Sequence, residues 1–101
     1  MGENQNKLEL VVFPYSVGEV RVGYKTERVF KDGDELEKSL QAVVAELRIA
    51  LEHYSIKRYG SNLFKVYSDG ASIRVQSGLH DITEEDRLII KNTVTTINES
   101  S

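Results

Sequence analysis

The sequence predicts an α+β domain with the element order β-β-α-β-β-α, in which an antiparallel sheet has two helices packed on one face. Three observations support this fold class: segments that alternate apolar and polar residues, one long segment with apolar residues at helical spacing, and an Asp-Gly pair typical of a hairpin turn. One domain over 7–98 accounts for the 101-residue chain, with 1–6 and 99–101 as flexible tails. Hydrophobic residues at 40% and charged residues at 29% are typical of a globular domain rather than a disordered chain.

The first hairpin is predicted from two β-rich segments near the N-terminus. Residues 8–13 form an apolar run, which we expect residues 14–16 (Pro-Tyr-Ser) to end. The segment that follows alternates apolar with polar or small residues, and its apolar members are Val20, Val22 and Tyr24. This alternation predicts a half-buried strand, which could continue to Phe30.

A long helix is predicted from residue 34 to residue 54. Asp34 and Glu37 have the spacing of a capping box, in which each side chain bonds a free backbone N–H at the helix start. Apolar residues then recur at spacings of three and four, which places them on one face: Leu36, Leu40, Val43, Val44, Leu47, Leu51 and Tyr54. Such a helix spans about 30 Å and strands of six or seven residues only about 20–23 Å, so we expect one end to extend beyond the sheet.

A second hairpin is predicted with Asp69 and Gly70 as the two loop residues of a type I′ turn. Counting outward from that turn predicts two pairs of core residues, Val66 with Ile73 and Phe64 with Val75. The other face of this hairpin then carries Lys65, Tyr67, Arg74 and Gln76. In this register Lys65 lies directly opposite Arg74.

A final helix is predicted to start at the capping pattern Thr83-Glu84-Glu85-Asp86. Its apolar residues are Leu88, Ile90, Val94 and Ile97. The run 93–97 is rich in β-branched residues, which are poor helix formers, so a ragged or strand-like end is the alternative there.

The two halves of the chain also resemble each other. Each pairs a hairpin with a helix, and the triplet Val20-Arg21-Val22 is similar to Ile73-Arg74-Val75. A duplicated β-β-α unit would explain the similarity, although three residues can agree this well by chance.

The sequence shows no catalytic constellation, no metal-ligand spacing and no phosphate-binding loop. Its acidic clusters fall at predicted helix starts, where the helix dipole favours carboxylates: Asp32, Asp34, Glu35 and Glu37, then Glu84, Glu85 and Asp86. His53 has no second ligand arranged around it, and His80-Asp81 has no accompanying serine or cysteine motif. We therefore expect no enzyme, metal or cofactor, with an unrecognised small enzyme as the less favoured alternative.

The candidate partner surface is a basic segment interleaved with tyrosines. The segment 53–80 contains four cationic residues and one carboxylate, although the whole chain has a net charge of −3. The candidate residues are Lys57, Arg58, Tyr59, Lys65, Tyr67 and Arg74. Cations opposite each other on paired strands repel, so either an anionic ligand neutralises them or Glu9 or Glu19 of the first hairpin does so; a solvated face is a further alternative.

The reverse side of the long helix carries a narrow second apolar stripe of Ala42, Ala45 and Ile49. Alanine favours helices by itself, but small residues in a row also allow a second helix to approach closely. Together with the predicted overhang, this stripe favours a homodimer.

These features favour a non-enzymatic protein-interaction or regulatory module, of the kind that small phage or mobile-element proteins use to bind a host factor. The alternative is a nucleic-acid-binding protein that uses the outer face of the second hairpin. The chain has no cysteine, no apolar run of the roughly 18–20 residues that a membrane span needs, and no apolar N-terminal signal, so we expect a cytoplasmic protein without a membrane partner. No small-molecule substrate and no resemblance to a known family is evident.

Overall fold

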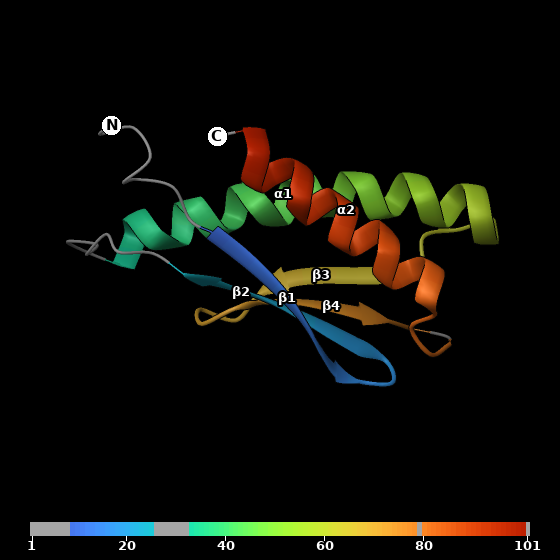
Figure 1. Cartoon of the computed structure of the whole chain (residues 1–101). Coiled ribbons are helices and arrows are strands. Elements are labelled where there is room, and N and C mark those ends of the chain that lie inside the picture. The colour runs from blue at the N-terminus through green and yellow to red at the C-terminus, as the bar shows by residue number, and fades with distance from the viewer. Residues whose placement is uncertain (1–8, 26–32, 79, 101) are drawn as a thin grey trace.

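The computed structural model describes residues 9–25, 33–78 and 80–100, and it has the predicted α+β fold. The elements are β1 (Glu9–Ser16), β2 (Glu19–Lys25), α1 (Gly33–Tyr59), β3 (Phe64–Ser68), β4 (Ile73–Ser77) and α2 (Glu84–Ser100). The strands form one antiparallel sheet in the order β1-β2-β4-β3, and both helices lie on the same face of it (Figure 1). Residues 99 and 100, expected in a tail, belong to α2, whereas 1–6 and 101 lie outside the described residues.

The two β-β-α halves meet at the centre of the sheet. β2 pairs with β4, so the similar triplets lie opposite each other and Arg21 faces Arg74 across the pair. The helix of each half packs on the hairpin of the other half: α1 packs on β3, and α2 packs on β1. This is the arrangement that a duplicated β-β-α unit would produce.

The core forms between the sheet and the predicted face of α1. The residues predicted to be buried there are all buried, with at most 8% of each exposed: Leu40, Val43, Val44, Leu47, Phe64, Val66, Ile73 and Val75. On α2, Ile90 and Val94 are also buried, but Leu88 is 55% exposed. Successive helix positions are 100° apart, so Leu88 and Ile90 cannot share one face.

The first hairpin differs from prediction at Pro14. β1 continues to Ser16, so the expectation that residues 14–16 end the strand is wrong. Proline cannot donate a ladder hydrogen bond, but β1 is an edge strand, where proline is tolerated, and its pairing with β2 becomes irregular between Pro14 and Ser16. The proposed continuation of β2 to Phe30 falls outside the described residues.

The β3–β4 loop also differs from prediction. It spans residues 69–72 and is not a two-residue type I′ turn, because Gly70 has a positive φ of 92° and Asp69 does not. Asp69 Oδ1 instead accepts bonds from the backbone N–H groups of Ala71 and Ser72, both at 2.9 Å. The register is therefore shifted by two residues, with Val66 opposite Val75 and Phe64 opposite Ser77. A shift of two keeps every side chain on its predicted face.

Both helices are longer than predicted. α1 ends at Tyr59 rather than near residue 54, because Gly60 adopts a φ of 91° and its N–H bonds the carbonyl of Ile56 at 2.9 Å. α2 stays helical through its β-branched residues, and Asn98 holds the last turn by bonding both the N–H and the carbonyl of Leu10. The side chain of Asp34, predicted to cap α1, lies outside the described residues, as does Asp32.

Candidate functional site

The candidate site is the face of the sheet that points away from the two helices, because no described element covers it (Figure 1). Strand pairing places these side chains on it: Glu9, Val11, Phe13, Tyr15, Glu19, Arg21, Lys25, Lys65, Tyr67, Arg74 and Gln76. We call this set the open face. Its four cations exceed its two carboxylates, so the open face is positively charged although the chain is acidic.

Glu19 is the centre of the open face and is only 7% exposed. Its Oε2 accepts hydrogen bonds from Arg21 Nε at 3.0 Å and Arg74 Nε at 2.8 Å. Its Oε1 accepts from Arg74 Nη2 at 3.2 Å and from Gln76 Nε2 at 3.1 Å. The bond from Arg74, supported by those from Gln76 and Arg21, outweighs the effect of burial and lowers the pKa of Glu19 to about 2.

Glu19 holds together two arginines that would otherwise repel. Arg21 and Arg74 are direct cross-strand neighbours, and like charges in such a pair are destabilising without an anion between them. One carboxylate against two guanidinium groups leaves one positive charge in excess. Glu19 uses one N–H of Arg21 and two of Arg74, and no other acceptor in the described part of the chain bonds either group. Both arginines therefore keep donors for a ligand.

Aromatic rings flank the arginine pair on both sides. The guanidinium carbon of Arg21 lies 3.7 Å from the centre of the Tyr15 ring, and Tyr15 is 58% exposed. On the opposite side the Tyr67 ring has Arg74 at 5.6 Å and Lys65 at 5.5 Å. Gln76 orients Tyr67 by donating to its hydroxyl oxygen at 3.2 Å. Each ring is thus accompanied by a cation.

A third ring, that of Phe13, lies against Gly23 on the open face. A Cβ atom at residue 23 would be 3.0 Å from Phe13 Cε1, so a larger residue there would displace the ring. Phe13 is 42% exposed. Glycine at this position therefore allows the ring to lie close to β2.

The structure divides the predicted partner surface into two parts. Lys65, Tyr67 and Arg74 lie on the open face, although Lys65 pairs with Gln76 and the predicted Lys65–Arg74 pairing is wrong. The other candidates lie at the end of α1, in the helix layer on the opposite side of the sheet: Lys57, Arg58 and Tyr59. There Arg58 bonds Glu85 at 3.0 Å.

Sequence reasoning missed the contribution of the first hairpin to this face. Tyr15 is not among the predicted candidates, because residues 14–16 were expected to end the strand. Arg21 had a signal, since the alternation of β2 puts it on the polar side and the repeated triplet singles it out. Glu19 was considered as an internal partner of the basic residues, and the structure shows that it bonds Arg74.

A second polar cluster surrounds Asp86, which is fully buried. Its Oδ1 accepts from the hydroxyls of Tyr54 at 2.5 Å and Tyr59 at 2.9 Å. Its Oδ2 accepts from the backbone N–H of Thr83 at 3.0 Å, and the Asp86 N–H bonds Thr83 Oγ1 at 3.0 Å, which completes the predicted capping box. Burial alone would raise the pKa of Asp86, but these hydrogen bonds outweigh it and the pKa is lowered. Burial and Asp86 together raise the pKa of Tyr54, which therefore stays protonated.

The same cluster contains a Ser–His–Asp chain of contacts. His80 Nε2 lies 3.2 Å from Asp86 Oδ2, and Nδ1 lies 3.3 Å from Ser77 Oγ. His80 thus bonds Asp86 and not its sequence neighbour Asp81. An acyl-transfer site would also need free N–H donors near the serine, but the N–H groups of Ser77 and Gly78 are bonded to the carbonyls of Gly18 and Leu63. The geometry favours a structural role that joins α1, β4 and α2.

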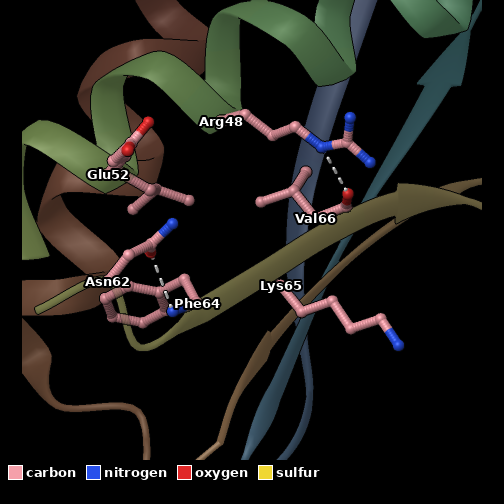
Figure 2. Close-up of a pocket in the computed structure, with 7 residues that line it drawn as sticks. Arg48, Glu52, Asn62, Phe64, Lys65 and Val66 are labelled. Atoms are coloured by element: carbon pink, nitrogen blue, oxygen red, sulfur yellow. Dashed lines mark hydrogen bonds between the residues drawn. The ribbon is translucent and has the colours of Figure 1, made fainter.

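A hollow lies at each edge of the described sheet, between the edge strand and the helix above it. The first, of about 240 Å³, lies between α1 and β3 and is lined by Arg48, Leu51, Glu52, Asn62, Phe64, Lys65 and Val66 (Figure 2). Arg48 Nε donates to the Val66 carbonyl at 3.0 Å, which satisfies an edge group that another strand could otherwise bond (Figure 2). The second hollow, of about 290 Å³, is lined by Val12, Pro14, Val20, Glu84, Arg87, Leu88 and Lys91.

Comparison of the chain with protein-family models, with curated proteins and with solved structures finds no match. Within the described ranges, no three His, Asp or Glu side chains group as ligands of a metal ion. Nor does any helix in that part of the chain have the length and apolar character needed to cross a bilayer.

Proposed function

We propose that the chain binds single-stranded nucleic acid on the open face of its sheet. The observation that carries this proposal is the row Tyr15–Arg21–Arg74–Tyr67, which crosses all four strands. Two tyrosine rings stand at its ends, and a cross-strand arginine pair with unused donors stands between them.

Each part of this row matches one part of a nucleotide chain. Bases stack on aromatic rings with about 1–3 kcal/mol per base, whatever the base sequence. Guanidinium groups form charge-assisted, bidentate hydrogen bonds with phosphate oxygens. Three strand spacings amount to roughly 14 Å across the sheet. Tyr15 lies two residues along β1 from Phe13, the residue opposite Arg21, so a nucleotide strand that crosses the sheet diagonally could stack on both tyrosines and place phosphates over the arginines.

An acidic protein segment is the competing anionic ligand, and the shape of the surface favours nucleic acid. The two hollows named above lie between the sheet and the helices, where protein side chains could enter. The open face instead presents rings and planar guanidinium groups on a sheet. Exposed rings beside cations suit the bases and phosphates of a nucleotide strand.

Fluorescence anisotropy with labelled dT12 and rU12 at low salt tests the proposal. We expect micromolar affinity that weakens steeply with salt as counterions are released. Tyr15→Ala and Tyr67→Ala should each weaken binding about fivefold or more, the loss of one stacked base.

A matched pair of charge reversals supplies the control for this experiment. Lys65→Glu lies on the open face, and Lys57→Glu makes the same charge change on α1, on the other side of the sheet. We expect only Lys65→Glu to abolish binding. Absence of binding at tens of micromolar protein, or equal losses in the two variants, would reject the open face as the site.

A second candidate function, protein binding through α1, is favoured by the exposure of its outer side. Ile49 is 70% exposed and Ile56 is 50% exposed, and Ala42 and Ala45 are exposed on the same side. Their spacing forms an apolar stripe that a second copy of the chain could cover around a two-fold axis. A small regulatory protein of phage type that binds a host factor would use such a surface in the same way.

Light scattering tests this second candidate. A homodimer should have twice the chain mass of 11.4 kDa, and Ile49→Glu should return it to one chain mass while circular dichroism stays that of a folded protein. Val17→Glu is the matched control, since Val17 is 68% exposed in the β1–β2 turn, away from α1. A wild-type mass of one chain at tens of micromolar would exclude the dimer.

A further inference from the structure

The hollow beneath α2 combines an apolar wall with a cationic rim. Val12 and Val20 contribute to the wall from the first hairpin, and Leu88 contributes from α2. Val20 is 1% exposed and Leu88 is 55% exposed, so the wall runs from the core to the surface. Arg87 and Lys91, four residues apart on α2, lie on neighbouring turns and form the rim.

Arg87 has a polar atom that the fold leaves without a partner. Its Nε is shielded from solvent, and no acceptor in the described part of the chain bonds it. The nearest carboxylate contact, from Nη1 to Glu84 Oε1, is 3.9 Å long, and the Glu84 side chain is 96% exposed, so this pair contributes little. Buried donors in proteins usually bond a protein group, an ordered water or a ligand, so this N–H is available to an acceptor that enters the hollow.

The corresponding hollow at the other edge of the sheet lacks this feature. There Arg48 Nε already donates to the Val66 carbonyl at 3.0 Å (Figure 2). The two hollows have equivalent places in the two halves of the fold, but only the guanidinium beneath α2 has a shielded N–H to offer. This difference assigns the ligand site to the α2 hollow.

We propose that the α2 hollow binds an aliphatic monocarboxylate. Arg87 and Lys91 hold the carboxylate, and the aliphatic chain lies against Val12, Val20 and Leu88. A carboxylate can accept two hydrogen bonds from one guanidinium group. The lining carries two cations, Arg87 and Lys91, and one carboxylate, Glu84, so its net charge of one matches a monocarboxylate. The volume of about 290 Å³ is at the small end for ligand sites, so the ligand is a small molecule.

A nuclear magnetic resonance titration of the ¹⁵N-labelled chain with sodium octanoate tests this site. Octanoate should shift the amide signals of Val12, Val20 and Leu88 and saturate with a dissociation constant of about 1 mM or lower. Octanol, which has the chain without the charge, and acetate, which has the charge without the chain, should each bind at least about tenfold more weakly, a difference of about 1.4 kcal/mol.

Two variants and one control locate the binding. Arg87→Gln/Lys91→Gln should reduce octanoate affinity to that of octanol, whereas Lys57→Gln, an equal loss of charge on exposed α1 surface, should leave it unchanged. Leu88→Ser, at a half-exposed position that the fold tolerates, should also weaken binding at least about fivefold. Absence of saturating shifts, equal binding of octanol, or unchanged affinity in either the double variant or Leu88→Ser would overturn the proposal.

Discussion

Glu19 on the open face and Asp86 at the junction of the helices are both nearly buried carboxylates, but they are stabilised in different ways. Asp86 accepts hydrogen bonds from two tyrosine hydroxyls of α1 and, from the segment before α2, from a backbone N–H and His80. Glu19 is bonded by two arginines and Gln76 on a face that the described elements leave uncovered. We call the first the closed network, because it joins α1 to the start of α2, and the second the open network, because it lies on the uncovered face of the sheet.

The difference indicates what each network does. A closed network of donors around one carboxylate stabilises the fold and specifies how α1, β4 and α2 meet. The open network has one more cation than Glu19 can neutralise, and its guanidinium groups have N–H donors that Glu19 does not use. Neither the extra cation nor the unused donors are needed for the stability of the fold. A change at Asp86 should therefore act mainly on folding, and a change at Glu19 should act on both folding and binding.

The largest expected effect is that of Asp86→Ala. It removes the acceptor of four hydrogen bonds and leaves the hydroxyls of Tyr54 and Tyr59 buried without a partner, which should lower the free energy of unfolding by about 3–5 kcal/mol. Urea unfolding monitored by circular dichroism measures this. Because the pKa of Asp86 is lowered in the folded state, its contribution is present above the usual pKa of aspartate and is lost as the pH falls below it. A loss below about 1 kcal/mol at pH 7 would contradict the closed-network interpretation.

A smaller loss of stability is expected for Glu19→Gln. The variant leaves the Arg21–Arg74 pair without its anion, which should cost about 1–2 kcal/mol at pH 7. The pKa of Glu19 is lowered from 4.5 to about 2, so its stabilisation is fully present above pH 4.5 and is lost as the pH falls towards 2. Urea midpoints of wild type and variant should therefore differ at pH 7 and converge near pH 2. A constant difference across this range would mean that the charge of Glu19 is not the stabilising feature.

The same substitution should improve binding at the open face. Glu19→Gln adds one net positive charge beside Arg21 and Arg74, so affinity for dT12 should rise about threefold to tenfold at low salt, and its salt dependence should steepen. Asp86→Asn is the control, since it makes the same charge change within the closed network and should leave affinity unchanged in the folded protein. Anisotropy titrations at two salt concentrations measure both the affinity and its salt dependence. Weaker binding by Glu19→Gln would argue against an anionic ligand on this face.

The smallest effect is expected for Ser77→Ala. Ser77 Oγ contributes one long contact of 3.3 Å to His80 at the rim of the closed network, so its loss should cost less than about 1 kcal/mol. Thermal unfolding should show a midpoint lowered by no more than a few degrees. A loss comparable to that of Asp86→Ala would mean that the network depends on the orientation of His80 more than on the carboxylate.

Local patterns in the sequence determined the six elements, their order and the buried side of α1, β2, β3 and β4. Helical spacing placed Leu40 and Leu47 in the core, and strand alternation placed Val20 and Val75 there. The capping box at Thr83 and Asp86 was also readable, since its bonds lie within four residues. These features depend on neighbours a few positions apart, so the sequence alone contains them.

Only the tertiary structure decided which strands and side chains come together over long distances. Backbone hydrogen bonds between strands do not depend on side-chain identity, so nothing local specifies that β2 pairs with β4 and that Arg21 meets Arg74. The register of the second hairpin depends on the loop conformation at Asp69, and strand β1 extends past Pro14 because it lies at an edge. Asp86 became the centre of a network because α1 ends beside α2, which brings Tyr54 and Tyr59 to it. The core follows from periodicity, and the open face follows from the order of the strands.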